Sequence, residues 1–328
     1  MNFDHLFQQF SQLKVGVIGD VMLDTYWWGK VDRISPEAPV PVVAVSNKEE
    51  RIGGAANVAL NLQALGANVF LVSVLGKDLD GEQLSKLVQQ NSISAAYMVQ
   101  SANRITTNKI RIISRNQHMM RLDAEMIDDL IKEDQALLLA SVKNFIDTVK
   151  PDVIILEDYN KGVLTENGIR QIIALCKQHN IIVTVDPKRT NFFSYKGVDI
   201  FKPNLKEVKD ALNIIEDKTD AESLKAIHTE LASKLQHSIS LITLSEKGVF
   251  YHAEKEGNII SSHVRSIADV SGAGDTVIAV ASLVYAATKD MQLMAAMANI
   301  AGGLVCEEVG TVAINKTKLL DECKHLLA

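Results

Sequence analysis

A short run of small and acidic residues, Asp269 to Thr276, carries the residue types that a phosphate-binding site needs. Gly272 and Gly274 let the backbone turn tightly and aim its N–H groups inward, and the apolar run that follows predicts a helix whose start adds a positive dipole end. Asp275 lies in the first turn of that helix, where its carboxylate can accept a proton from an incoming hydroxyl group. The alternative is an ordinary helix start in which Ser271 or Asp275 serves only as a cap.

A second glycine-containing segment, Gly53 to Gly66, pairs a Gly-Gly helix entry with a face of small residues. Gly53 and Gly54 permit a ligand to approach the backbone closely, and Asn57 offers both a donor and an acceptor to sugar hydroxyls. The alternative is a tight contact between a helix and a sheet. The common nucleotide motifs do not explain either segment, because the sequence lacks GxxxxGK[ST] and the first strand does not continue into GxGxxG.

The elements that must position these residues alternate along the chain. Apolar runs bounded by turn residues alternate with amphipathic stretches, which is typical of a parallel sheet covered by helices. The predicted strands are Lys14–Gly19, Val69–Val74, Val153–Leu156, Ile181–Val185, Asp199–Phe201 and Ile239–Leu244. The predicted helices are Ala55–Leu65, Leu79–Gln90, Glu133–Val149, Glu166–His179, Leu205–Leu212, Ala221–Leu235, Thr276–Ala287, Met291–Cys306 and Lys316–Leu327. The sequence therefore predicts an α/β fold.

Two segments break this rhythm. Residues 24–46 contain a cluster of three prolines, and residues 95–123 alternate in the manner of half-exposed strands. We expect them to form a small β lid over one end of the sheet, within a single domain that spans residues 1–328.

Bulk composition excludes several functional classes. The 328 residues are 47% hydrophobic with a net charge of −6, and basic residues are scattered, so neither a nucleic-acid surface nor a membrane anchor is indicated. The three cysteines are far apart and odd in number, which argues against a disulfide framework and favours a reducing compartment. The first ten residues do not resemble a signal peptide, and the longest apolar run, Val277–Ala287, is too short to span a bilayer. We expect a cytoplasmic protein with a small-molecule ligand.

The two glycine segments together resemble the two signatures of the PfkB carbohydrate kinase family, in the family's order and at opposite ends of the chain. Between them, Asn204-Leu205-Lys206-Glu207 resembles the family's NxxE element, and Thr243–Gly248 stands where its nucleotide-binding strand end is expected. The resemblance implies the ribokinase-like fold: a central, mostly parallel sheet with helices on both faces plus a small β lid. It also implies ATP-dependent phosphorylation of a sugar.

Three further parts of the sequence resemble the heptose 7-phosphate kinases of bacterial ADP-heptose synthesis: residues 32–42, residues 114–117 with 121–123, and Asp158 to Gly162. This implies phosphorylation of D-glycero-β-D-manno-heptose 7-phosphate at its anomeric hydroxyl, which gives the 1,7-bisphosphate on the route to the lipopolysaccharide inner core. Bifunctional members add a C-terminal nucleotidyltransferase, but this sequence has no HxGH, so we expect the kinase step alone and a separately encoded nucleotidyltransferase. The alternatives are a PfkB kinase for another sugar or sugar phosphate and a non-catalytic sugar-binding regulator.

The resemblance also implies roles for individual residues. Asp275 becomes the catalytic base, and the backbone N–H groups of Gly272, Ala273 and Gly274 stabilise the transferred phosphoryl group. Asn204 and Glu207 hold Mg²⁺ through water, or else form an N-cap and a capping box. The nucleotide site is completed by Thr243, Ser245, Gly248 and, near the adenine, Asn299. Asp269 and Ser271 are candidates for a monovalent-cation site such as K⁺, although Asp269 equally fits a solvated turn.

The predicted sugar site combines hydroxyl-binding and phosphate-binding residues. The hydroxyl-binding candidates are Asp20, Asp24, Gly53, Gly54, Asn57 and Asp158. The 7-phosphate needs cations, and the candidates are Arg33, Lys109, Arg111, Arg115, Lys161 and Lys188.

Three positions depart from the family pattern. Ser271 replaces the usual Thr, Ile52 replaces a frequent Pro, and Glu157 places an extra carboxylate near the sugar site. Exposed lid edges and Trp27 and Trp28 predict a homodimer.

Overall fold

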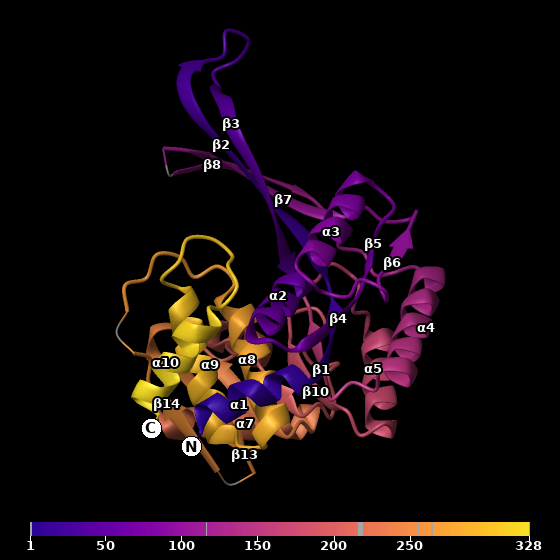
Figure 1. Ribbon diagram of the computed structural model, residues 1–328, viewed down its shortest axis with the longest axis vertical. Helices are drawn as coiled ribbons and strands as arrows, with labels where there is room; N and C mark the ends of the chain where they lie inside the picture. Colours follow the sequence, from indigo (N-terminus) through magenta and orange to yellow (C-terminus); the bar gives the residue numbers. More distant parts are fainter. Residues whose placement is uncertain (1, 116, 216–218, 255, 264, 328) are drawn as a thin grey trace.

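The computed structural model describes residues 2–115, 117–215, 219–254, 256–263 and 265–327 (Figure 1). Within these ranges an eight-stranded sheet forms the centre, in the order β14-β13-β12-β11-β10-β9-β1-β4. The six strands from β12 to β4 are parallel, whereas β13 and β14 are antiparallel to their neighbours. Their bounds are β1 (Lys14–Gly19), β4 (Asn68–Val72), β9 (Val153–Glu157), β10 (Ile182–Asp186), β11 (Ile200–Phe201), β12 (Ile239–Thr243), β13 (Val249–Ala253) and β14 (Glu256–Ile260).

Helices cover both faces of this sheet because alternate strand residues point to opposite sides. In β9, Val153 and Ile155 belong to one apolar cluster, while Ile154 and Leu156 belong to the other. The first cluster packs under α1 (Phe3–Gln9), α2 (Ala55–Leu65), α8 (Ala273–Thr288), α9 (Met291–Val305) and α10 (Lys316–Leu326). The second packs under α4 (Lys132–Val149), α5 (Glu166–Gln178), α6 (Leu205–Leu212) and α7 (Ala221–Leu235). The predicted α/β architecture is therefore confirmed.

A separate four-stranded sheet, the lid, projects from the body (Figure 1). Its order is β3-β2-β7-β8, with bounds β2 (Val21–Ile34), β3 (Pro41–Gly54), β7 (Thr107–Ser114) and β8 (Gln117–Ala124). The lid strands run beyond the predicted segment: β2 starts two residues after β1 ends, and β3 continues directly into α2. The lid is thus connected without a linker to Asp20, the single residue between β1 and β2, and to α2, which carries Asn57.

One part of the predicted lid lies elsewhere. β6 (Val99–Ser101) pairs with β5 (Val74–Gly76) in a two-stranded sheet beside α3 (Leu79–Gln90). Residues 95–106 are therefore outside the lid sheet, because their strand partner is in the body. In the ranges that the structure describes, no helix has the length and apolar character needed to cross a bilayer.

Candidate active site

Asp275 lies buried in the first turn of α8, where two side chains from distant elements donate hydrogen bonds to it. Asn57 Nδ2 of α2 lies 2.6 Å from Asp275 Oδ2, and the hydroxyl of Tyr159, just after β9, lies 2.7 Å from Oδ1. Gly272 caps the helix with φ of 78°, and a Cβ there would lie 3.0 Å from Asn57 Nδ2. The turn that carries Asp275 therefore fits closely against the side chain that orients it.

The environment of Asp275 suits a proton acceptor. Burial raises the pKa of Asp275 to about 6, and the hydrogen bonds from Asn57 and Tyr159 oppose that rise by stabilising the carboxylate. At neutral pH the group is therefore ionised but more basic than an exposed aspartate. A carboxylate of this kind at a helix N-terminus can take the proton of a hydroxyl that attacks a phosphate held by the same turn.

Asn57 has one unused polar atom. Its Oδ1 is buried and has no hydrogen-bond partner among the described residues, although its amide group is anchored to Asp275. A buried acceptor without a donor is costly, and a ligand hydroxyl would satisfy it. The sequence-predicted sugar contact at Asn57 is thus compatible with the geometry.

The glycine pair before α2 has a structural reason. Gly54 has φ of 61°, and its Cβ would lie 2.4 Å from the Asp20 carbonyl oxygen. A Cβ on Gly53 would lie 2.4 Å from Asp24 Oδ2. At Gly54 the positive φ and the contact with the Asp20 backbone require glycine, whereas at Gly53 the nearest atoms belong to the Asp24 and Met22 side chains. A direct ligand contact at these glycines stays a prediction.

Two residues beside the glycine turn that precedes α8, Lys202 and Asp186, are not among the sequence-predicted site residues. Lys202 Nζ lies 2.7 Å from Asp186 Oδ2, and both side chains are buried, with exposed fractions of 3% and 4%. A Cβ on Gly274 would lie 3.4 Å from the Lys202 ammonium and 3.5 Å from the Asp186 carboxylate. Their positions in the sequence could have indicated them, because Asp186 ends β10 and Lys202 directly follows β11. Ligands bind at this edge of the sheet in open α/β folds.

Glu157 is the third carboxylate at this edge. It ends β9, is fully buried and pairs in register with Asp186 of β10. Burial and the neighbouring carboxylates of Asp186 and Asp275 raise the pKa of Glu157 well above its usual range. Glu157 is one of the three departures from the family pattern, and it lies beside the predicted base.

Asp20 holds the loop that carries Tyr159. Its carboxylate accepts hydrogen bonds from the backbone N–H groups of Tyr159 at 2.8 Å and of Lys161 and Val163 at 3.1 Å each. Asp158 likewise accepts from Tyr195 Oη at 2.6 Å, and burial raises its pKa to about 6. These two buried carboxylates are engaged with protein groups, so their predicted contacts with the sugar stay predictions while their positioning role is visible.

The basic candidates divide into two groups. Arg111 forms an ion pair with Asp24 on the neighbouring lid strand. Lys161 Nζ lies 2.8 Å from Glu125 Oε2. The ammonium groups of Lys109 and Lys188 lie 5.7 and 5.6 Å from the centroid of the Tyr159 ring. These four basic side chains are half-buried around Tyr159 and the inner end of the lid.

Arg33 and Arg115 do not join them. Both are exposed, Arg33 near the outer end of β2 and Arg115 in the turn between β7 and β8 with φ of 50°. Their prediction as phosphate ligands finds no support in this arrangement, because each lies at the far end of its lid strand.

The predicted nucleotide residues gather at the carboxyl ends of β11 and β12. Asn204 and Glu207 form the capping box of α6, and Glu207 Oε1 also accepts from Lys188 Nζ at 2.7 Å. Thr243 forms a backbone bridge with Asn204, and Ser245 and Gly248 bound the tight turn that follows β12. The capping alternative is therefore present, and a water-mediated contact of the same side chains with Mg²⁺ is compatible with it.

Three further predicted residues lie in α9 and in the loop before α8: Asn299, Asp269 and Ser271. Asn299 of α9 donates to the Ser261 carbonyl oxygen at 2.9 Å, which ties the helix to the segment after β14. Asp269 accepts hydrogen bonds from Ser271 and from the Gly310 N–H at 3.0 Å. The carboxylate thereby organises the loop before α8. Monovalent-cation binding by Asp269 and Ser271 stays a prediction.

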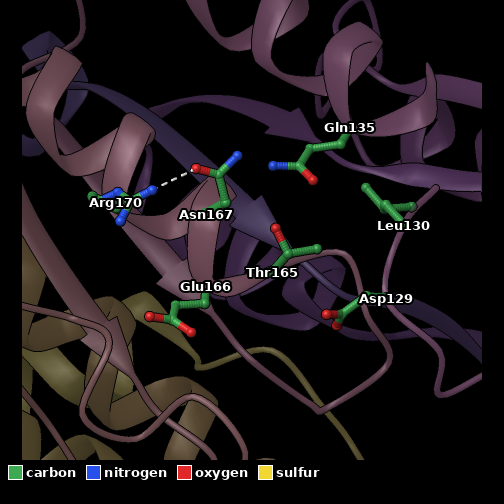
Figure 2. Close-up of a pocket in the computed structure, with 7 residues that line it drawn as sticks. All are labelled: Asp129, Leu130, Gln135, Thr165, Glu166, Asn167 and Arg170. Atoms are coloured by element: carbon green, nitrogen blue, oxygen red, sulfur yellow. Dashed lines mark hydrogen bonds between the residues drawn. The ribbon is translucent and has the colours of Figure 1, made fainter. Parts of the chain in front are cut away.

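A cavity of about 450 Å³ opens elsewhere, between the start of α5 and the start of α4. Figure 2 shows the residues that line it, Asp129, Leu130, Gln135, Thr165, Glu166, Asn167 and Arg170. None of the predicted site residues is among them, and Arg170 is already hydrogen-bonded to Asn167. The cavity is therefore separate from the cluster around Asp275.

Comparison with known proteins identifies the family of the chain. Residues 12–318 match the family model described as pfkB family carbohydrate kinase. The chain is 37% identical over 326 residues to the bifunctional protein HldE of Syntrophotalea carbinolica, covering 99% of this chain and 66% of that protein. It is 40% identical over 308 residues to HldE of Aliarcobacter butzleri, covering 93% and 62% respectively. The chain thus spans slightly less than two thirds of these curated relatives.

Solved structures share the fold. Phosphofructokinase-2 from Escherichia coli in complex with potassium superposes with a TM-score of 0.79 at 16% identity, covering 96% of this chain and 100% of that one. A ribokinase from Arabidopsis thaliana complexed with ribose and ATP gives 0.73 at 17% identity, covering 94% and 98%. The ribokinase-like fold is therefore confirmed.

Proposed function

The chain belongs to the pfkB family of carbohydrate kinases, and we propose that it transfers the γ-phosphoryl group of ATP to the anomeric hydroxyl of D-glycero-β-D-manno-heptose 7-phosphate. The observation that carries the kinase reaction is the buried carboxylate of Asp275 at the start of α8, held by Asn57 and Tyr159. The substrate rests on the lid segments that resemble heptose 7-phosphate kinases. The 36–40% identity to proteins named HldE over nearly the whole chain agrees with it.

The proposed mechanism is a direct in-line transfer. The sugar O–H bond breaks and its proton passes to Asp275, the anomeric oxygen bonds to the γ-phosphorus, and the bond to the ADP oxygen breaks. In this proposal the N–H groups of Gly272, Ala273 and Gly274 stabilise the charge that develops on the transferred group. The Ala273 N–H donates to the Val270 carbonyl oxygen at 3.3 Å in this structure and would exchange that hydrogen bond for one to the phosphoryl group. Lys202, paired with Asp186, places its buried ammonium group beside Gly274 at the same turn.

The lid supplies the phosphate end of the sugar site in this proposal. Lys109 lies over the Tyr159 ring, Lys161 follows Tyr159 in the loop after β9, and Arg111 on β7 pairs with Asp24 and lies over the Tyr26 ring. In this proposal the three cations bind the 7-phosphate when the lid closes. Closure would also exclude water, which competes with the sugar for the phosphoryl group. Mg²⁺ supplies positive charge to the phosphates of bound ATP, and water-mediated contacts with Asn204 and Glu207 fit the capping geometry.

The assembly and location are part of the same proposal. The lid exposes Ile34, Val45 and Met120, with exposed fractions of 69%, 44% and 55%, and a homodimer would cover them.

We place the reaction in the cytoplasm, where ATP is supplied and where the three unpaired cysteines stay reduced.

The direct test is phosphoryl transfer from ATP to synthetic heptose 7-phosphate, with the product position fixed by phosphorus NMR. We expect a 1,7-bisphosphate. Strong preference for a hexose phosphate in a parallel panel would identify a different sugar kinase, and no transfer to any sugar would favour a sugar-binding regulator.

A further inference from the structure

Three carboxylates converge at the carboxyl edge of the central sheet. Glu157 ends β9, Asp186 ends β10, and Asp275 lies in the first turn of α8. One oxygen from each lies within 4.8 Å of the others, and all three side chains are buried. Like charges this close in a dry site repel each other, so the arrangement needs a compensating positive charge or bound protons.

The side chain of Glu157 is the independent sign that a ligand belongs here. It is fully buried, and neither of its carboxylate oxygens has a hydrogen-bond partner in the part of the chain that the structure describes. Asp186 Oδ1 also lacks one there, because Lys202 binds Oδ2 and Lys188 Nζ stays 3.7 Å away. Unused oxygens from two adjacent strands therefore face one small space.

The local charges are unbalanced. Lys202 is buried against Asp186 and neutralises one of the three carboxylates. Lys188 is shared with Glu207, whose oxygen is closer to it, at 2.7 Å, than that of Asp186. Two negative charges remain when all the carboxylates are ionised, which matches one divalent cation. Hard cations such as Mg²⁺ and Mn²⁺ prefer carboxylate oxygens as ligands.

We propose that Glu157 and Asp186 form a divalent-cation site beside Asp275, which binds Mg²⁺ or Mn²⁺ before the nucleotide arrives. The site differs from the predicted contacts at Asn204 and Glu207, whose side chains are hydrogen-bonded to each other's backbone in the capping box. It adjoins the phosphate-binding turn, because the Asp186 carboxylate lies 3.5 Å from the Cβ position of Gly274.

A cation at this point would offset negative charge where a phosphoryl group meets the base. This use of the site rests on the proposed kinase function, whereas binding of the cation does not.

The test is titration of Mn²⁺ into nucleotide-free protein, with free Mn²⁺ followed by electron paramagnetic resonance. We expect one Mn²⁺ per chain in the wild type and at least tenfold weaker binding in Glu157→Gln and Asp186→Asn. Glu125→Gln is the matched control, since it removes one carboxylate from the Lys161 ion pair and leaves the three-carboxylate cluster intact. We expect its Mn²⁺ affinity to equal that of the wild type.

Circular dichroism and the melting temperature without metal check that each variant is folded. Glu157→Gln has the shape of the neutral acid, so its melting temperature should equal that of the wild type. Glu157→Ser, which also lacks the carboxylate and has a shorter side chain, is the second variant. Saturating Mn²⁺ should raise the melting temperature of the wild type but not that of either variant.

The proposal is overturned if the wild type binds no Mn²⁺ or if both Glu157 variants keep wild-type affinity. Binding that survives in Glu157→Gln but disappears in Glu207→Gln would place the cation at the capping box instead. Phosphoryl transfer to heptose 7-phosphate is measured separately, so an active kinase without this site and a metal-binding protein without that activity are distinguishable.

Discussion

The hydroxyl of Tyr159 donates a hydrogen bond to Asp275 at 2.7 Å, although 116 residues separate them in the chain. The loop that carries Tyr159 is fixed in turn by the carboxylate of Asp20, which accepts its backbone N–H at 2.8 Å. Asn57 approaches Asp275 from the helix that continues the lid. The proposed base is thus held from the sheet edge on one side and from the lid connection on the other.

The pH dependence of the reaction should report the ionisation of Asp275. Its pKa is raised to about 6 by burial, and only the ionised form can accept the proton of the sugar. We expect kcat/KM to be constant at neutral pH and to fall about tenfold per pH unit below pH 6. Steady-state rates across this range check the prediction, and a constant rate down to pH 4.5 would contradict it.

Replacing Tyr159 should shift the pH at which kcat/KM begins to fall. Its hydrogen bond stabilises the ionised carboxylate, so Tyr159→Phe should raise the pKa of Asp275 and shift the fall in kcat/KM to higher pH. The comparison is a pH profile of the variant beside Tyr97→Phe, a substitution of a tyrosine that packs between Phe70 and Phe145. If kcat/KM of Tyr159→Phe fell at the same pH as in the wild type, the Tyr159 hydroxyl would not influence the ionisation of Asp275.

A buried histidine cluster under α7 should make folding sensitive to acid. His228 and His237 both contact the hydroxyl of Ser240, and burial lowers the pKa of each to about 4. The unfolded chain binds protons near pH 6.5, so stability is complete above that pH and falls as the pH drops toward 4. The loss attributable to His237 should reach at most about 3 kcal/mol.

The check is chemical unfolding at pH 7 and pH 5 for the wild type and His237→Gln. The variant cannot take up this proton, so its free energy of unfolding should fall less between the two values. Equal losses in both proteins would show that other groups dominate the acid dependence.

The fold was largely predictable because the strands are apolar and the helices amphipathic. The predicted strand Lys14–Gly19 and helix Ala55–Leu65 match the structure residue for residue. The hairpin of β13 and β14 and the short α1 were missed. Glu256–Ile260 is too polar to indicate a strand, and Phe3–Gln9 spans only two turns, so its buried face becomes evident only where it packs against α10.

The site was predictable only where local sequence determines geometry. Asp275, the glycine turn and the capping box of Asn204 and Glu207 depend on neighbours in sequence, and they form as short-range rules indicate. Tyr159 and Lys202 reach the site through sheet order and register, which one sequence does not specify. The exposed position of Arg115 between β7 and β8 likewise depends on where the lid strands reverse, and its contact with a phosphate stays a prediction.

The role of Asp275 as the proton acceptor is tested by Asp275→Asn, which keeps the shape of the side chain and removes its basicity. We expect kcat with heptose 7-phosphate to fall by about three orders of magnitude, while ATP binding measured by calorimetry changes little. Asp24→Asn, at the lid ion pair, serves as the comparison and should weaken sugar-phosphate binding more than it lowers kcat. A kcat of Asp275→Asn within tenfold of the wild-type value would show that Asp275 is not the catalytic base.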